Sequence, residues 1–157
     1  MAELTFVNEV HWVGRGREGG GSVTTGGQTL VLSAPSSMGG RGVGTSPEEL
    51  LVSAVASCYV GTLFHLLGRD GLPADDVTVD AVGTVSDYPS RTARFSRIVV
   101  NPTIRGADSS RLPEYQASAQ VAREHCFIGR ALRDTISYEV GEVTLRTPAS
   151  EGAEVGS

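Results

Sequence analysis

Residues 50–68 form a run of nineteen positions without a carboxylate or an arginine. The run is long enough to cross a membrane as a helix, but it contains two serines, a threonine and a histidine. Mean hydropathy over the whole chain is only −0.05, so we expect a central helix that is buried on most sides. One small sheet cannot cover so apolar a helix alone, and this surplus predicts a homodimer that buries it.

The sequence also indicates where this helix begins and ends. Ser46 is a suitable N-cap, Pro47 takes the first helical position, and Glu49 completes a capping box. Glycine and proline at positions 71 and 73 end the pattern. We therefore expect a helix from residue 47 to about residue 68.

The rest of the chain alternates strands and helices. Periodicity and turn residues predict strands at 5–13, 22–25, 28–32, 77–85, 94–104 and 137–145. A second helix is expected at 114–125, with helical structure continuing to residue 133 directly or after a break. This order predicts an α+β fold in which antiparallel sheets pack around the long buried central helix.

The length of 157 residues fits one domain with a substantial core. We place this domain at residues 1–146. Residues 147–157 are small, polar and acidic, which predicts a disordered tail.

Charge and composition exclude several classes of function. A net charge of −5 argues against nucleic acid or an anionic membrane surface as a partner, because both require a basic footprint. All 13 basic residues are arginine, which excludes mechanisms that use a Schiff-base lysine. The first residues lack the basic and apolar regions of a signal peptide, so we expect a reducing cytoplasmic location.

The chain has two cysteines, Cys58 and Cys126, which lie 68 residues apart. Both fall within segments expected to be helical, so they do not form a disulfide framework of the secreted kind. Such a pair is either two inert buried thiols or one redox couple.

Several motifs favour the redox couple. His11-Trp12-x-Gly14 is followed by a glycine-rich turn that contains arginine, and Thr45-x-Pro-Glu-Glu-Leu then precedes Cys58 on one helix. Together with the late Cys126, this pattern resembles the OsmC/Ohr family of osmotically inducible and organic hydroperoxide resistance proteins. The similarity spans about residues 11–145, and the His-Trp-x-Gly motif favours the OsmC-like branch.

The resemblance implies an intertwined dimeric thiol peroxidase that reduces organic hydroperoxides to alcohols. It assigns Cys58 as the peroxidatic cysteine and Cys126 as the resolving cysteine, with Arg17 and Glu48 as the ion pair that positions the cationic group. It also implies recycling by a dithiol reductant of the lipoyl type, and we expect no cofactor or metal. The chemistry fits these residues, because an arginine can stabilise both a thiolate and a developing alkoxide.

Two details complicate the assignment. Aligning the glycine-rich turn from either end moves the family's arginine between positions 17 and 18, and Arg15 stands nearby as an alternative. Family members usually have proline and then serine after the second cysteine, whereas residues 127–129 here are Phe-Ile-Gly.

Helix geometry adds an expectation of its own. Glu48 and Cys58 are ten residues apart on one helix, which places them about 15 Å apart along its axis and on different faces. Glu48 therefore cannot assist the Cys58 of its own chain. We expect an active site at the subunit interface, with Glu48 serving the partner.

The residues near the cysteines also suggest a substrate class. Apolar side chains would give the thiol an apolar rim that favours alkyl or lipid hydroperoxides over hydrogen peroxide. The expected rim residues are Val55, Tyr59, Leu63, Phe64 and Phe127.

Other chemistries fit less well. A cysteine hydrolase needs a histidine base beside the nucleophile, and His65 lies about 10 Å along the helix from Cys58. His125 adjoins Cys126, but neighbouring residues on a helix diverge. A metal site is also disfavoured, because the usual close ligand spacing is absent from the four possible ligands, Cys58, His65, His125 and Cys126. A non-enzymatic member of the same fold that binds a small apolar ligand remains the alternative.

Overall fold

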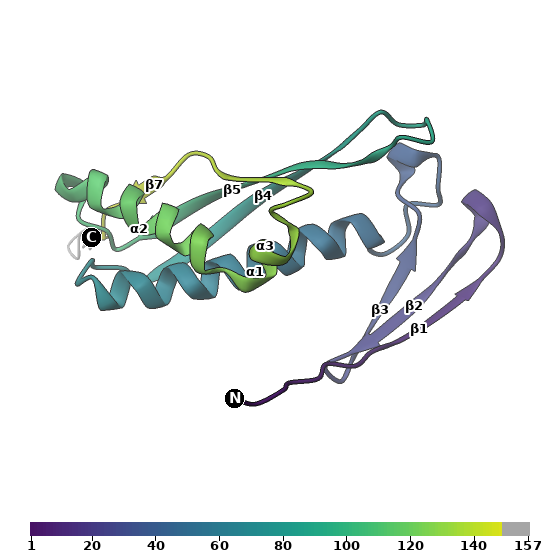
Figure 1. Cartoon of the computed structure of the whole chain (residues 1–157), viewed down its shortest axis with the longest axis horizontal. Coiled ribbons are helices and arrows are strands. Elements are labelled where there is room, and N and C mark those ends of the chain that lie inside the picture. Colours follow the sequence, from purple (N-terminus) through teal and green to yellow (C-terminus); the bar gives the residue numbers. More distant parts are fainter. Residues whose placement is uncertain (149–157) are drawn as a thin grey trace, which may run out of the picture. The chain divides into compact units, whose positions relative to one another are not determined.

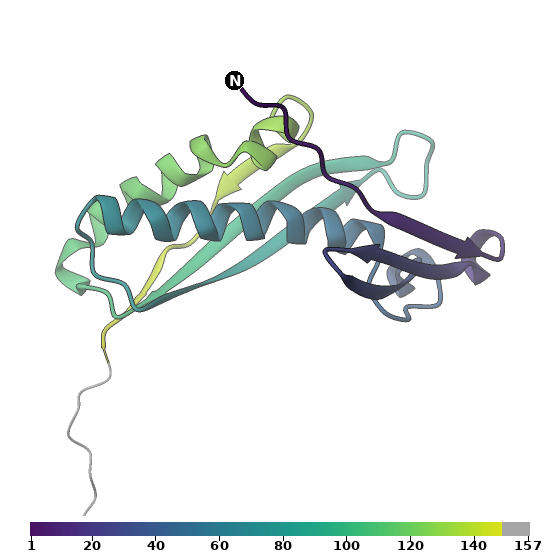
Figure 2. The same ribbon diagram turned by 90° about the horizontal axis from the view of Figure 1, so that it is seen from below.

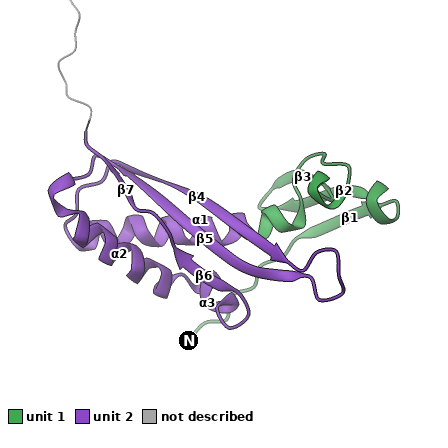
Figure 3. Ribbon diagram, turned by 90° about the horizontal axis from the view of Figure 1, so that it is seen from above, with its two compact units in different colours: residues 1–51 green, residues 52–157 purple. Residues whose placement is uncertain are grey.

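The computed structural model describes residues 1–148 and has a mixed α+β architecture (Figure 1). The expected disordered tail therefore lies mostly outside the described residues. The chain divides into two compact units, the first comprising Met1–Leu51 and the second beginning at Val52 (Figure 3).

The first unit is a three-stranded antiparallel sheet. Its strands are β1 (Glu9–Val13), β2 (Gly20–Thr25) and β3 (Gln28–Ser33), in that spatial order. The expected hairpin is confirmed, because Gly26 and Gly27 adopt φ of 55° and 76° between two paired strands, and a two-residue turn of this kind needs positive φ. Two short 3-10 helices, Gly16–Glu18 and Ser36–Met38, complete the unit.

The expected central helix is α1 (Pro47–Arg69). Its capping box forms, with the Glu49 N–H donating to Ser46 Oγ at 3.2 Å and Ser46 Oγ donating to the Glu49 carboxylate at 3.1 Å. At the other end Gly71 adopts a φ of 65°, and the Leu72 N–H bonds the Leu67 carbonyl. Positive φ at glycine is a common way to end a helix.

The second unit contains a four-stranded sheet built on a long hairpin. Strands β4 (Asp76–Ser86) and β5 (Arg94–Arg105) are antiparallel, and both β6 (Ser137–Val140) and β7 (Thr144–Arg146) pair with β5 in parallel. The sheet is therefore mixed rather than purely antiparallel.

The expected single strand at 137–145 is wrong, because the chain leaves the sheet between β6 and β7. Pairing stops at Val100 and resumes at Thr103 of β5. In this interval the Asn101 side chain accepts a hydrogen bond from the Glu142 N–H at 2.9 Å. Pro102 also lies here and has no N–H for a ladder.

Two helices and α1 cover one face of this sheet (Figure 2). They are α2 (Leu112–His125), preceded by a 3-10 turn at Ser109–Arg111, and α3 (Phe127–Leu132). The core contains alternate residues of β5 and one face of each long helix. Its fully buried members include Val55, Tyr59, Leu63, Leu67, Ile98, Val100, Ile104, Tyr115, Ala119 and Ala122.

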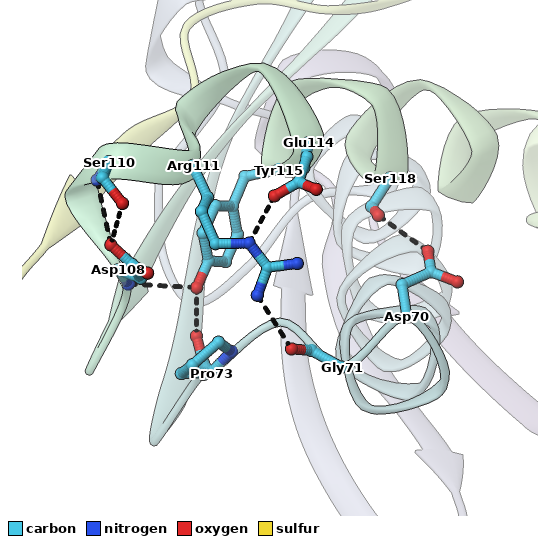
Figure 4. A network of polar contacts seen from close by, with 9 residues as sticks. All are labelled: Asp70, Gly71, Pro73, Asp108, Ser110, Arg111, Glu114, Tyr115 and Ser118. Atoms are coloured by element: carbon cyan, nitrogen blue, oxygen red, sulfur yellow. Dashed lines mark hydrogen bonds and ion pairs between the residues drawn. The ribbon is translucent and has the colours of Figure 1, made fainter.

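Polar contacts join the end of α1 to the start of α2 (Figure 4). The Tyr115 hydroxyl donates to the Pro73 carbonyl at 2.6 Å, and the Ser118 hydroxyl donates to Asp70 at 2.9 Å. Arg111 donates to the Gly71 carbonyl at 3.1 Å. These bonds fix how α2 lies along α1, and so where α2 ends.

The opposite face of α1 stays exposed in the single chain. Only 28% of the most apolar 18-residue stretch of α1 is buried. The length and composition of the helix would allow it to cross a membrane. The exposed positions are mostly small or apolar: Ser53, Ala54, Ser57, Gly61, Phe64, His65 and Gly68. A helix buried on most sides is therefore not found within one chain.

Candidate active site

The fold brings the two cysteines together in the second unit. Cys58 is half-buried on α1, and Cys126 is fully buried between α2 and α3. The Cys126 thiol points to the Val55 carbonyl at 3.9 Å, one turn before Cys58, and it interacts with the Cys58 thiol. Both cysteines are free, so the site is in its dithiol form.

Cys126 occupies a break between two helices. The sequence left open whether helical structure continues directly or after a break, and the structure shows a break, because Cys126 has a ψ of 103° and ends α2. It also caps α3, because its Sγ accepts a hydrogen bond from the Gly129 N–H at 3.5 Å. The residues that follow Cys126 thus supply a donor to the sulfur.

Gly129 has a second role at this break. A Cβ at this position would lie 2.2 Å from the ring of Tyr138 on β6. Only glycine lets that ring pack so closely against α3. Tyr138 and Gly129 were both missed in the sequence, where the only signal was a tyrosine inside a short strand.

The surroundings of Cys126 keep it protonated. Burial raises the pKa of its thiol above the ordinary value, and the neighbouring Cys58 adds to the increase. The Gly129 N–H and Tyr138 oppose this effect. A buried, protonated thiol is slow to react with an external oxidant.

Two buried tyrosines flank the cysteine pair, and burial raises the pKa of both. The Tyr59 hydroxyl donates to the Ala119 carbonyl at 3.1 Å. The Tyr138 hydroxyl is also buried and lies close enough to Cys126 to lower the pKa of that thiol, but no hydrogen bond of ordinary geometry links it to any residue among 1–148. Both hydroxyls are therefore buried, but only that of Tyr59 has a hydrogen-bond partner of ordinary geometry within residues 1–148.

The predicted ion-pair residues lie in the first unit. Arg17 is exposed in the 3-10 turn, with its guanidinium against Gly39, where a Cβ would lie 3.1 Å from it. Glu48 is half-buried in the first turn of α1, and its Oε2 is buried without a hydrogen-bond partner. Within the described part of the chain Arg17 and Glu48 form no ion pair with each other, and Arg15 is likewise exposed.

The expected apolar rim is only partly accessible. Val55, Tyr59 and Leu63 are core residues with relative exposures of 1%, 0% and 0%. Phe64 and Phe127 are exposed, at 46% and 60%. All three histidines are exposed, and residues 1–148 contain no cluster of three or more potential metal ligands.

Comparisons with known proteins identify the family. Residues 39–141 match the family model described as OsmC-like protein, so the chain belongs to the OsmC-like protein family. It is 27% identical over 143 residues to the uncharacterized protein YmaD of Bacillus subtilis, covering 89% of this chain and 94% of that protein. It is 31% identical over 131 residues to the uncharacterized protein ACIAD3023 of Acinetobacter baylyi, covering 82% and 87%.

Solved structures share the fold. An organic hydroperoxide resistance protein OsmC from Legionella pneumophila matches with a TM-score of 0.72 and 24% identity, over 92% of this chain and 99% of that one. The organic hydroperoxide resistance protein OhrB of Bacillus subtilis matches with a TM-score of 0.65 and 20% identity, over 88% and 98%. The α+β fold class is thereby confirmed.

Proposed function

We propose that this protein is a thiol peroxidase that reduces organic hydroperoxides. The observation that carries the proposal is the position of Cys126, whose buried thiol lies against the turn of α1 that leads to the half-buried Cys58. Membership of the OsmC-like family, and fold relatives named as organic hydroperoxide resistance proteins, support it.

The proposed cycle has three steps that use the two thiols. The Cys58 thiolate attacks the hydroperoxide, which breaks the O–O bond, leaves a sulfenic acid on Cys58 and releases an alkoxide that takes a proton to become the alcohol. Cys126 then attacks the sulfenic sulfur, which forms the disulfide and releases water. A dithiol reductant, for example of the lipoyl type, returns both cysteines to thiols by exchange.

Arg17 and Glu48 are proposed to complete the site. Arg17 has no carboxylate partner within residues 1–148, and the buried Glu48 Oε2 has no donor. A buried carboxylate oxygen without a partner is costly. If the Arg17 guanidinium reaches this oxygen in the assembled protein, both Arg17 and Glu48 gain a partner. Because Glu48 lies about 15 Å along α1 from Cys58, it would act in the partner's site.

A homodimer is proposed from the apolar surfaces that a single chain leaves uncovered. One face of α1 is exposed along its length, and the first unit buries few apolar side chains of its own. A surface of this kind is typical of an obligate interface. The exposed apolar residues of the first unit include Val10, Trp12, Val13, Leu30 and Val31.

Substrate and location follow from the same proposal. The exposed Phe64 and Phe127 favour alkyl or lipid hydroperoxides over hydrogen peroxide. Free cysteines in a cycle that depends on a dithiol fit a reducing cytoplasm.

An assay of hydroperoxide consumption tests the proposed function. Purified protein with dihydrolipoamide is expected to consume cumene hydroperoxide at a saturable rate at least tenfold above its rate with hydrogen peroxide. The same mixture without the protein gives the background rate of hydroperoxide consumption. No consumption above background, together with saturable binding of an apolar fluorescent probe, would instead support the ligand-binding alternative.

A further inference from the structure

The hydroxyl of Tyr138 is the least satisfied polar group near the two thiols. The side chain is only 4% exposed, and its oxygen is buried with no hydrogen-bond partner among residues 1–148. Buried hydroxyls nearly always have a partner, because an unpaired one loses its bonds to water without replacement. The Tyr138 hydroxyl is therefore available to donate to a nearby acceptor.

The ring of Tyr138 is held firmly in place. It packs where a side chain on Gly129 would clash, at 2.2 Å, and the Arg123 guanidinium lies over it at 5.8 Å from the centroid. Arg123 Nε also donates to the Tyr138 carbonyl. Since the Gly129 N–H bonds Cys126 Sγ at 3.5 Å, one residue of α3 positions both the tyrosine and the thiol.

Few other groups can act on the Cys126 sulfur. Cys58 and Tyr59 approach it from α1 and Tyr138 approaches it from β6, while the Arg123 guanidinium of α2 lies over the Tyr138 ring. Tyr59 already donates to the Ala119 carbonyl. Within the described part of the chain, Tyr138 is the side-chain hydroxyl near Cys126 that has no hydrogen-bond partner of ordinary geometry.

We propose that Tyr138 donates a hydrogen bond to the Cys126 sulfur when that sulfur carries negative charge during thiol–disulfide exchange. This inference rests on the proposed use of Cys58 and Cys126 as a redox couple. A thiolate is a much stronger acceptor than the thiol of the dithiol form. The raised pKa of Tyr138 keeps its hydroxyl protonated, and so able to donate, at neutral pH.

The bond acts most directly when the disulfide is reduced. A thiolate of the dithiol reductant attacks the more accessible Cys58 sulfur, the Cys58–Cys126 bond breaks, and Cys126 leaves with the electron pair. Tyr138 stabilises this leaving thiolate, which later takes a proton from solvent. The second thiol of the reductant then releases Cys58 by forming the reductant's own disulfide.

Tyr138→Phe tests the inference, with Tyr59→Phe as the matched control. Both variants keep a buried ring, and only the first removes the orphaned hydroxyl. The intramolecular disulfide is formed with diamide, which requires no peroxidase activity, and its reduction by dithiothreitol is followed by intact mass at pH 7. We expect about tenfold slower reduction in Tyr138→Phe, because the loss of one hydrogen bond to a charged group costs about the free energy of a tenfold change. In Tyr59→Phe we expect a change of less than about threefold.

A stability measurement separates this role from a structural one. Because the hydroxyl is unpaired in the dithiol form, reduced Tyr138→Phe is expected to unfold at the same temperature as the wild type or higher. A lower unfolding temperature together with unchanged reduction rates would overturn the inference, as would equal rates in all three proteins. Slow reduction in Tyr138→Phe with no hydroperoxide consumption by the wild type would uphold the inference and reject the peroxidase proposal.

Discussion

Replacing Cys58 with serine is expected to abolish hydroperoxide reduction, with a loss of at least about a thousandfold in kcat/KM. A serine hydroxyl is far from ionised at neutral pH and is a weak nucleophile toward peroxide oxygen. The side chain is half-buried on α1, so the change of one atom should leave the fold intact. Consumption of cumene hydroperoxide in the presence of a dithiol measures the loss.

Ser57→Ala is the matched control for this substitution. Ser57 lies next to Cys58 but is exposed, and its hydroxyl donates to the Ser53 carbonyl of its own helix at 2.7 Å. We expect the activity of Ser57→Ala to stay within about twofold of that of the wild type. Substantial activity in Cys58→Ser would show that the nucleophile is a different residue.

Gly61→Glu is expected to separate the homodimer and to remove activity with it. Gly61 lies in the middle of the exposed face of α1, and a Cβ there would meet nothing within 4 Å in the single chain. The substitution should therefore not destabilise the monomer, because a glutamate has space there and a higher helix propensity than glycine. A carboxylate buried in an interface is, in contrast, strongly unfavourable. We expect the dissociation constant to rise at least about a hundredfold, measured by light scattering over a dilution series.

Gln120→Glu adds the same charge to the exposed side of α2 and serves as the control. It should remain dimeric and active. If Glu48 serves the partner's site, Gly61→Glu loses activity in parallel with dimer content. A wild-type monomer with full activity would contradict both the dimer and the shared site.

Local signals predicted much of the fold from the sequence. The capping box at Ser46 and the Gly26-Gly27 hairpin depend on neighbouring residues, and both are found. The break between β6 and β7 depends on the side chain of Asn101 on another strand. Such a contact leaves no trace in the periodicity of residues 137–145.

In the candidate site, too, the sequence indicated some features and missed those that depend on contacts between distant elements. The resemblance to the OsmC/Ohr family predicted that the two cysteines act as a pair, and the structure places their thiols close together. The packing of Tyr138 on Gly129 depends on how α3 meets β6, so the sequence could not indicate it. The roles of Arg17 and Glu48 depend on an assembly and stay predictions.

Intact-mass spectrometry tests the central claim most directly. Reduced wild-type protein and Cys126→Ser are each treated with one equivalent of cumene hydroperoxide. The wild type is expected to lose two hydrogens as the Cys58–Cys126 disulfide forms, and Cys126→Ser to gain one oxygen as the sulfenic acid on Cys58. Unchanged masses in both proteins would contradict the peroxidase cycle.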